Sequence, residues 1–274
     1  MSSKKTISAF WWSSVKFEKK EFENFGDIIG PYLIKKISRK KVRFVQPKKR
    51  KWLDIYTTVY ITVGSILAHV DKKSIVWGSG LIDRKTIVSE AIFLAVRGPE
   101  TRNCLVKQGY IVPEIYGDPA LLLPKYYTPK TVKKFKIGII PHYVDFYLVS
   151  DRYHNNPEIK IIDLLNNSVE NVIDDICSCE HIISSSLHGI IVSHAYGISA
   201  VWVKFSDKLF GDDIKFEDYF ESVAVFNTTP ILFDKKKSIA QLIDLIKQKS
   251  ILIQPEIIES LQKGLMSVCP FKTF

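Results

Sequence analysis

Residues 179–203 constrain the fold of this chain more than any other segment, because they contain a complete strand–helix–strand unit. Residues 179–183 have the apolar run of a buried strand, and residues 200–203 have that of the next strand. Between them, apolar side chains recur at helical spacing over residues 187–195, and Gly197 ends that helix. Two parallel strands joined by a helix predict an α/β fold.

The same alternation of strands and helices runs through most of the chain. Strands are expected at residues 7–12, 59–63, 74–77, 92–96, 136–140 and 159–164, and helices at 28–37, 99–108, 169–177, 238–249 and 255–265. This alternation is typical of parallel sheets covered by helices on both faces. We expect residues 151–157 to form a polar loop.

A chain of 274 residues, 46% of them hydrophobic, suits two compact domains. A linker rich in Pro, Tyr and Lys at residues 125–136 separates them. We therefore expect an N-terminal Rossmann-like domain at residues 1–124 and a second at residues 135–245. The helices within residues 246–274 are expected to pack back on the first domain.

The chain carries a net charge of +10, and much of it is concentrated in one segment. Residues 35–51 contain ten Lys or Arg residues and no acidic residue. A solvated loop and helix end is one interpretation, and attraction to anionic lipid or substrate is another. Nucleic acid is disfavoured, since no nucleic-acid-binding fold or repeated stacking pattern accompanies the segment. No apolar run approaches the ~18 residues of a spanning helix, and we expect no signal peptide.

Metal-binding patterns are weak. A single Cys-x-Cys pair, Cys177 and Cys179, lacks a second pair, and His142 with Asp145 lacks a third ligand. We expect reduced cysteines, no metal and no cofactor.

A serine-rich turn joins the strand at residues 179–183 to the following helix. Ser184, Ser185 and Ser186 precede the helix, and His188 lies in its first turn. Free N–H groups and the positive end of the helix dipole favour an anion at such a position. His188 could donate a proton or a hydrogen bond to that anion, although a helix-start histidine bonded to a carbonyl is the plainer interpretation. The turn predicts a site for a phosphorylated or carboxylated ligand.

Other polar residues also fall at the carboxyl ends of expected strands, where open α/β sheets bind ligands. They are Ser65, Ser79, Arg97 and His142. Arg97 could bind a carboxylate or phosphate in a bidentate manner, or form an ion pair with Glu100 or another acid. His142 could assist binding or simply pack in its loop. Two sheets facing each other across a central cleft would bring these residues to one site.

With these residues assembled, the chain resembles the polysaccharide pyruvyl transferase family. The motifs that carry the resemblance extend from about residue 10 to residue 205 and are Asn24-Phe25-Gly26-Asp27, Gly64-Ser65-Ile66-Leu67, Trp77-Gly78-Ser79-Gly80, Val96-Arg97-Gly98-Pro99, Gly117-Asp118-Pro119-Ala120-Leu121-Leu122, Ile139-Ile140-Pro141-His142-Tyr143 and Ser185-Ser186-Leu187-His188-Gly189. The resemblance implies a two-domain fold like that of GT-B glycosyltransferases. It also implies transfer of pyruvate from phosphoenolpyruvate onto a sugar, usually as a cyclic ketal.

The resemblance suggests a role for each candidate residue. His188 would be the catalytic acid, and Asp27 would take a proton from a sugar hydroxyl, although an Asx turn or helix cap explains Asp27 equally well. The residues expected to bind phosphoenolpyruvate are Arg97, His142, Ser185, Ser186, Leu187, His188 and Gly189. Those expected to bind the acceptor are Asn24, Asp27, Ser65 and Ser79.

The resemblance further implies an acceptor from a bacterial capsule or exopolysaccharide of the cell envelope. A galactose- or mannose-type sugar on an undecaprenyl diphosphate carrier is the expected form, reached in the cytoplasm at the inner face of the membrane.

One departure from the family pattern bears on donor binding. Ser186 stands where the family usually has an arginine that is expected to contact phosphoenolpyruvate. Arg97, a lysine such as Lys204, or the hydroxyls and amides of the serine-rich turn would then hold the anion. Two other functions stay open: a GT-B glycosyltransferase that uses a nucleotide sugar, and a non-catalytic protein that binds an anion or a glycan.

Overall fold

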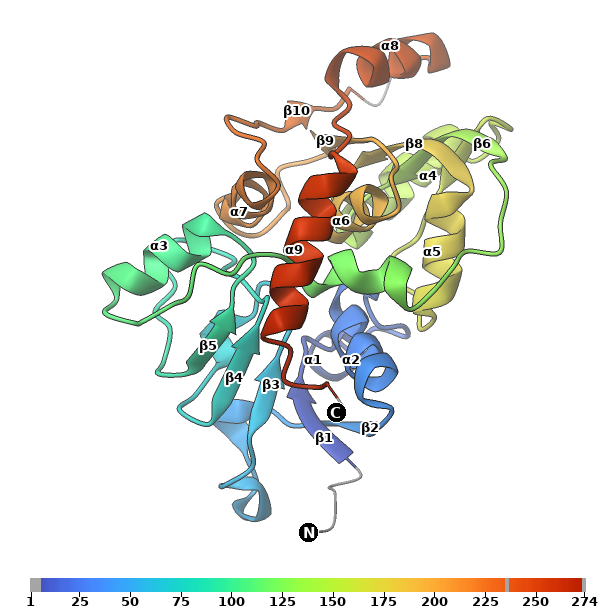
Figure 1. Cartoon of the computed structure of the whole chain (residues 1–274). Coiled ribbons are helices and arrows are strands. Elements are labelled where there is room, and N and C mark those ends of the chain that lie inside the picture. Colours follow the sequence, from blue (N-terminus) through green and yellow to red (C-terminus); the bar gives the residue numbers. More distant parts are fainter. Residues whose placement is uncertain (1–5, 235–236, 273–274) are drawn as a thin grey trace.

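The computed structural model describes residues 6–234 and 237–272, which form two parallel five-stranded sheets with helices around them (Figure 1). The N-terminal sheet contains β1 (Thr6–Phe10), β2 (Lys41–Phe44), β3 (Val59–Ile61), β4 (Ser74–Trp77) and β5 (Ile92–Ala95). The C-terminal sheet contains β6 (Phe135–Ile140), β7 (Ile159–Ile161), β8 (Cys179–Ser184), β9 (Ala200–Lys204) and β10 (Ile231–Leu232). The predicted α/β class and parallel sheets are confirmed.

The two sheets have the same topology. Their strand orders are β2-β1-β3-β4-β5 and β10-β9-β8-β6-β7, so each reads 2-1-3-4-5 when its strands are numbered along the chain. This order is one of the common doubly wound arrangements and is consistent with two Rossmann-like domains. The direction of strand addition reverses between β1 and β3 and between β6 and β8. Ligands of such sheets bind beyond the carboxyl ends of the strands at these two points.

Nine α-helices occur in the described residues: α1 (Ser14–Glu18), α2 (Phe25–Ser38), α3 (Pro99–Lys107), α4 (Phe146–Tyr153), α5 (Val169–Cys177), α6 (Leu187–Ala195), α7 (Ile214–Ser222), α8 (Ile239–Lys249) and α9 (Pro255–Ser267). The helix expected at residues 28–37 begins three residues earlier. The Asn24 side chain accepts a hydrogen bond from the Gly26 amide at 2.9 Å and so caps the helix.

Five elements differ from expectation, and the first is α1, where no helix was expected. The strand β2 lies inside the basic segment, and α4 extends into the expected polar loop at residues 151–157. The helix α7 and the short strand β10 were also not expected. The strand β10 has two residues and β2 has four, and strands this short show no clear periodic pattern.

The largest apolar core joins the two halves of the molecule. Buried side chains of α2, α5, α6 and α9 meet in it, together with the 3₁₀ segment η4 (Pro119–Lys125). The Trp77 indole N–H donates to the Leu265 carbonyl of α9 at 2.9 Å. The Gln262 amide, also on α9, donates to the Leu121 carbonyl at 2.7 Å. The last helix therefore contacts the N-terminal half of the chain, and Figure 1 shows it running from one half to the other.

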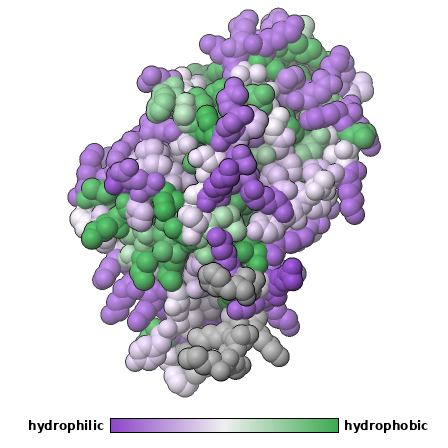
Figure 2. All heavy atoms as spheres, in the orientation of Figure 1, coloured by the Kyte–Doolittle hydropathy of each residue, from purple (hydrophilic) through white to green (hydrophobic). Residues whose placement is uncertain are grey.

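An apolar patch covers the β5 edge of the N-terminal sheet. Figure 2 shows these side chains gathered over β5 and beside α3. Ile87 is 80% exposed, Ile92 is 55% exposed and Ile111 is 95% exposed.

Within the described part of the chain, no helix combines the length and the apolar character needed to span a bilayer.

Candidate functional site

The carboxyl ends of β1, β6 and β8 meet at one place. The Glu18 carboxylate accepts a hydrogen bond from the Trp12 indole beyond β1 at 2.7 Å and from the Tyr143 hydroxyl beyond β6 at 2.9 Å. The His142 amide donates to the Ser185 hydroxyl beyond β8 at 2.9 Å. The points where ligands are expected in the two sheets are therefore neighbours.

His188 lies at this meeting point, in the first turn of α6. Its ring packs against Gly26, where a β-carbon would lie 2.2 Å from Nδ1. Only glycine allows the start of α2 to approach the imidazole this closely. The other ring nitrogen, Nε2, lies 3.5 Å from Oδ2 of the fully buried Asp118. Both of these atoms are buried without a hydrogen bond among the described residues.

Asp118 has a second role that explains its position. Its other carboxylate oxygen accepts a hydrogen bond from the Ala120 amide at 2.9 Å and caps η4. Gly-Asp-Pro at residues 117–119 is typical of a turn, and the structure adds the contact of Asp118 with His188. A carboxylate near Nε2 favours the ring form that carries a proton on this nitrogen.

The serine-rich turn is ordered by its own hydrogen bonds. The Ser184 hydroxyl lies within hydrogen-bonding distance of the Ile140 and Ser186 carbonyls and accepts from the Ser186 amide at 3.0 Å. The Ser186 side chain makes no cap hydrogen bond to α6, although Ser186 is the residue at the cap position. Ser186 therefore leaves the first amides of α6 without a side-chain cap, as an anion site requires.

Arg97 lies in a fully buried ion pair rather than a pair with Glu100. Its Nε donates to the Asp218 carboxylate of α7 at 3.0 Å, and both side chains are 0% exposed. Its remaining nitrogens donate to the Ser65 hydroxyl at 2.6 Å and the Leu81 carbonyl at 2.8 Å. Gly98 allows Asp218 of α7 to approach this closely, because a β-carbon at Gly98 would lie 1.8 Å from the Asp218 carbonyl oxygen. Binding of a donor anion by Arg97 stays a prediction, and the contacts shown are structural.

Replacing Arg97 by methionine is expected to lower the free energy of unfolding by about 3–5 kcal/mol, because Asp218 would remain buried without its cation. Urea denaturation followed by circular dichroism measures this. Arg84→Met is the matched control: its partners are partly exposed, so the loss should be at most about 1 kcal/mol. Equal losses in the two variants would contradict the assignment.

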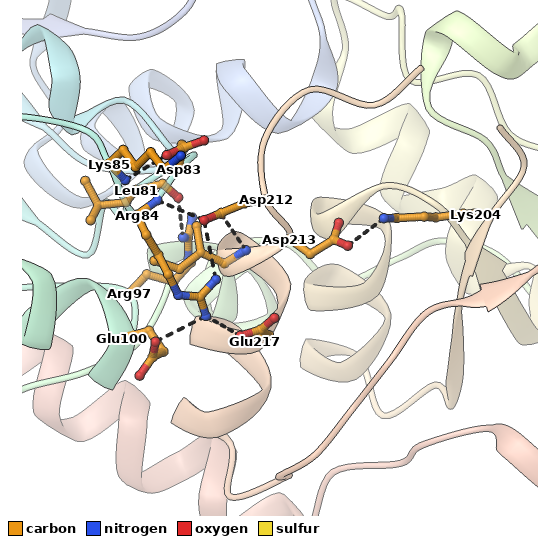
Figure 3. A network of polar contacts seen from close by, with 11 residues as sticks. Leu81, Asp83, Arg84, Lys85, Arg97, Glu100, Lys204, Asp212, Asp213 and Glu217 are labelled. Atoms are coloured by element: carbon orange, nitrogen blue, oxygen red, sulfur yellow. Dashed lines mark hydrogen bonds and ion pairs between the residues drawn. The ribbon is translucent and has the colours of Figure 1, made fainter. Parts of the chain in front are cut away.

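Arg84 forms a second, more exposed link between the halves. It contacts the carboxylates of Glu100, Asp212 and Glu217, which come from α3 and from the start of α7 (Figure 3). These three carboxylates raise the pKa of the Arg84 guanidinium. The links of Arg84 and Arg97 hold α7 against the loops that follow β4 and β5.

Lys215 is a cation that the sequence analysis did not single out. It lies on α7, and its charge interacts with those of Arg97 and Asp27. Burial, followed by the charge of Arg97, lowers the pKa of Lys215 to about 8. Burial and the charge of Lys215 lower the pKa of His142 to about 4, so that His142 is neutral near pH 7. The charge of Lys215 therefore acts on three residues expected at the site, Arg97, His142 and Asp27.

Asp27 lies in the same region and is partly buried. Burial raises the pKa of its carboxyl well above the usual range, and the charges of Glu18 and Glu23 raise it further, while Lys215 opposes them. The neutral form is favoured, because a buried carboxylate lacks water and has few compensating charges. Neither Lys215 nor the pKa of Asp27 could be read from a sequence pattern, since both depend on packing between distant segments.

Lys204 and the expected acceptor residues have defined partners. Lys204, at the end of β9, forms an ion pair with Asp213 at 2.5 Å. The Ser79 hydroxyl is buried and donates to the Gly64 carbonyl at 2.7 Å, and the Ser65 hydroxyl accepts from Arg97. Asn24 caps α2 as described above. Contact of these residues with an acceptor stays a prediction.

Within the residues that the structure describes, no three His, Cys, Asp or Glu side chains come together as a metal site would require. The Asp145 carboxylate beside His142 instead accepts a hydrogen bond from the Ser206 hydroxyl at 2.6 Å.

Two parallel five-stranded sheets of identical strand order define an α/β protein, consistent with two Rossmann-like domains. The sequence model of the polysaccharide pyruvyl transferase family matches residues 8–207, which is most of the chain. This protein belongs to that family. It is also 33% identical over 205 residues to uncharacterized protein L143 of Acanthamoeba polyphaga mimivirus, covering 72% of this chain and 69% of that protein.

Proposed function

We propose that this protein transfers pyruvate from phosphoenolpyruvate to a sugar and forms a cyclic ketal with release of phosphate. The family match supports a pyruvyltransferase, and the position of His188 between Asp118 and Gly26 is the observation that carries the proposal. We also propose that the two halves form a GT-B-like pair whose sheets face a central cleft.

The donor would be held by the first amides of α6 and by cations from the opposite segment. Phosphoenolpyruvate has a carboxylate and a phosphate, so two anionic groups need partners. Lys215 is the cation that substitutes for the arginine missing at Ser186, since among the described residues it has no carboxylate partner as close as that of Lys204. Arg97 contributes to the positive field from its ion pair, and His142 binds as a neutral hydrogen-bonding group.

His188 would deliver the proton that starts the reaction. Asp118 occupies the Nε2 side of the ring, so the donated proton comes from Nδ1 of the doubly protonated ring, on the side of Gly26. Protonation of the methylene carbon makes the adjacent carbon electrophilic, and a sugar hydroxyl adds to it and loses its proton. Phosphate then leaves with its bonding electron pair, and a second hydroxyl adds and loses its proton to close the ketal. One acid, together with fixed hydrogen-bond donors for the carboxylate and the phosphate, meets these demands.

Asp27 has a role that depends on its proton. The raised pKa of Asp27 favours the neutral carboxyl, which donates a hydrogen bond. Acceptance of the hydroxyl proton requires its ionised form, and the charge of Lys215 is the local group that favours that form. We propose that Asp27 hydrogen-bonds the substrate when the donor enters and accepts a hydroxyl proton as phosphate departs.

The acceptor would be a galactose- or mannose-type residue of a lipid-linked polysaccharide precursor, such as one on undecaprenyl diphosphate. The family description names a polysaccharide, which supports a sugar acceptor. A precursor at the cytoplasmic face of a membrane suits the basic segment at residues 35–51, which could contact anionic lipid.

Incubation with phosphoenolpyruvate and a panel of galactose- and mannose-terminated acceptors tests the proposal. The expected result is an acceptor mass increased by pyruvate less one water, with one phosphate released per ketal. Binding of phosphoenolpyruvate without a mass change on any acceptor would indicate a non-catalytic binding protein. Thermal stabilisation by a nucleotide sugar, with none by phosphoenolpyruvate, would indicate a glycosyltransferase.

A further inference from the structure

The amino end of the N-terminal sheet presents three large apolar or aromatic side chains to solvent within five residues. Trp52 is 81% exposed, Ile55 is 55% exposed and Tyr56 is 86% exposed. They lie in and directly after the 3₁₀ segment η2 (Trp52–Asp54), between β2 and β3. In Figure 1 this segment lies at the lower end of the molecule, away from the C-terminal sheet. We call residues 52–56 the aromatic tip.

The aromatic tip is held firmly, so its exposure is a property of the fold. Arg43 of β2 forms an ion pair with Asp54 at 2.6 Å. Arg50 forms an ion pair with Asp71 at 2.7 Å and donates to the Thr57 carbonyl at 2.5 Å. These contacts fix both sides of the tip to β2 and to the turn before β4.

The same contacts leave the surroundings of the tip positively charged. The two acidic residues next to it, Asp54 and Asp71, are each paired with an arginine. Several exposed lysines surround these pairs and have no ion pair recorded among the described residues: Lys41, Lys49, Lys51, Lys72 and Lys73. Aromatic and aliphatic side chains flanked by lysines are the pattern of a surface that enters the interface of an anionic bilayer.

A pocket beside the tip adds a site for a charged headgroup. It has a volume of about 630 Å³ and lies at the amino ends of β1 and β3. Its lining includes three basic side chains and several hydroxyls: Lys40, Arg43, Lys272, Tyr56, Thr57 and Thr58. Tyr56 belongs to both the pocket and the tip, so a lipid whose chains meet the tip could place its phosphate in the pocket.

We infer that this end of the molecule docks on an anionic phospholipid surface, with Trp52, Ile55 and Tyr56 entering the interface. The surrounding lysines supply the electrostatic attraction, and the apolar side chains supply the affinity that depends on burial. In this orientation the carboxyl edge of the N-terminal sheet, where His188 lies, faces away from the bilayer and stays open to a glycan.

Co-sedimentation with vesicles tests the inference without donor or acceptor, so its outcome is separate from that of the transfer reaction. Wild type is expected to bind vesicles of phosphatidylcholine mixed with phosphatidylserine. It is expected not to bind vesicles that contain only phosphatidylcholine. The triple variant Trp52→Ser, Ile55→Ser, Tyr56→Ser should bind at least about tenfold more weakly. The matched control replaces three exposed apolar residues elsewhere, Ile87→Ser, Ile111→Ser and Phe226→Ser, and should bind as wild type.

Charge and depth of insertion are measured separately. Lys49→Gln and Lys51→Gln should each weaken binding about fivefold, and added salt should weaken it further. All five tryptophans of the chain lie in described segments, and Trp52 is the exposed one. Brominated lipid should therefore quench the fluorescence of Trp52. The Trp52→Phe variant should lack this quenched component. Equal binding by the tip variant and wild type, or no binding of wild type to the anionic vesicles, would overturn the inference.

Discussion

Replacing His188 by alanine is expected to lower the rate of pyruvate transfer by about 10²–10⁴-fold, because the donor would lose its proton source. Phosphate release and ketal formation, measured together by mass spectrometry, should fall equally. Asp118→Asn should cause a smaller loss: it keeps the η4 cap but removes the negative charge 3.5 Å from Nε2. A loss from Asp118→Asn in the maximal rate with little change in KM would indicate that Asp118 acts by positioning the imidazole.

The control for this prediction is His154→Ala. His154 is exposed at the end of α4 and bonds only backbone carbonyls in its own turn, so transfer should be unchanged. Thermal unfolding of each variant checks that the fold is intact. Undiminished transfer by a folded His188→Ala variant would remove the central part of the proposed mechanism.

Replacing Lys215 by methionine is expected to raise the KM for phosphoenolpyruvate by about 10–100-fold, since a hydrogen bond to a charged group contributes about 1.5–3 kcal/mol. The effect should depend on pH. The pKa of Lys215 is lowered to about 8, so its amine is charged below pH 8 and loses its proton as the pH rises through 8. Donor affinity of wild type should therefore fall above pH 8, whereas that of Lys215→Met should show no such fall.

Two further variants make the Lys215 result specific. Lys215→Arg keeps its charge above pH 8 and should bind the donor there at least as well as at pH 7. Lys263→Met removes an exposed lysine of α9 and should leave the KM unchanged. His142 does not contribute to the change in donor affinity near pH 8, because its pKa is about 4. An unchanged KM in Lys215→Met would leave the serine-rich turn as the anion site.

Much of the fold could be predicted from local patterns. The unit β8–α6–β9 was predicted almost residue for residue, because an apolar strand, a helical spacing and a stop at Gly197 all lie within 25 residues of sequence. The strand β2 was missed because its four residues alternate inside a run of basic side chains. The helix α7 was missed as well, and with it Lys215 and Asp218, the two charges that it brings to Asp27 and Arg97.

The sequence by itself determined the α/β class, the family motifs and the position of His188 at a helix start, because each depends on residues close together in the chain. The tertiary structure decided which charges meet. Arg97 pairs with Asp218, which is 121 residues away, and Asp118 faces His188 from another segment. Burial and distance between such segments set the protonation of Asp27 and Lys215. Those quantities exist only once the two sheets are packed, since electrostatic interactions depend on separation and on exclusion of water.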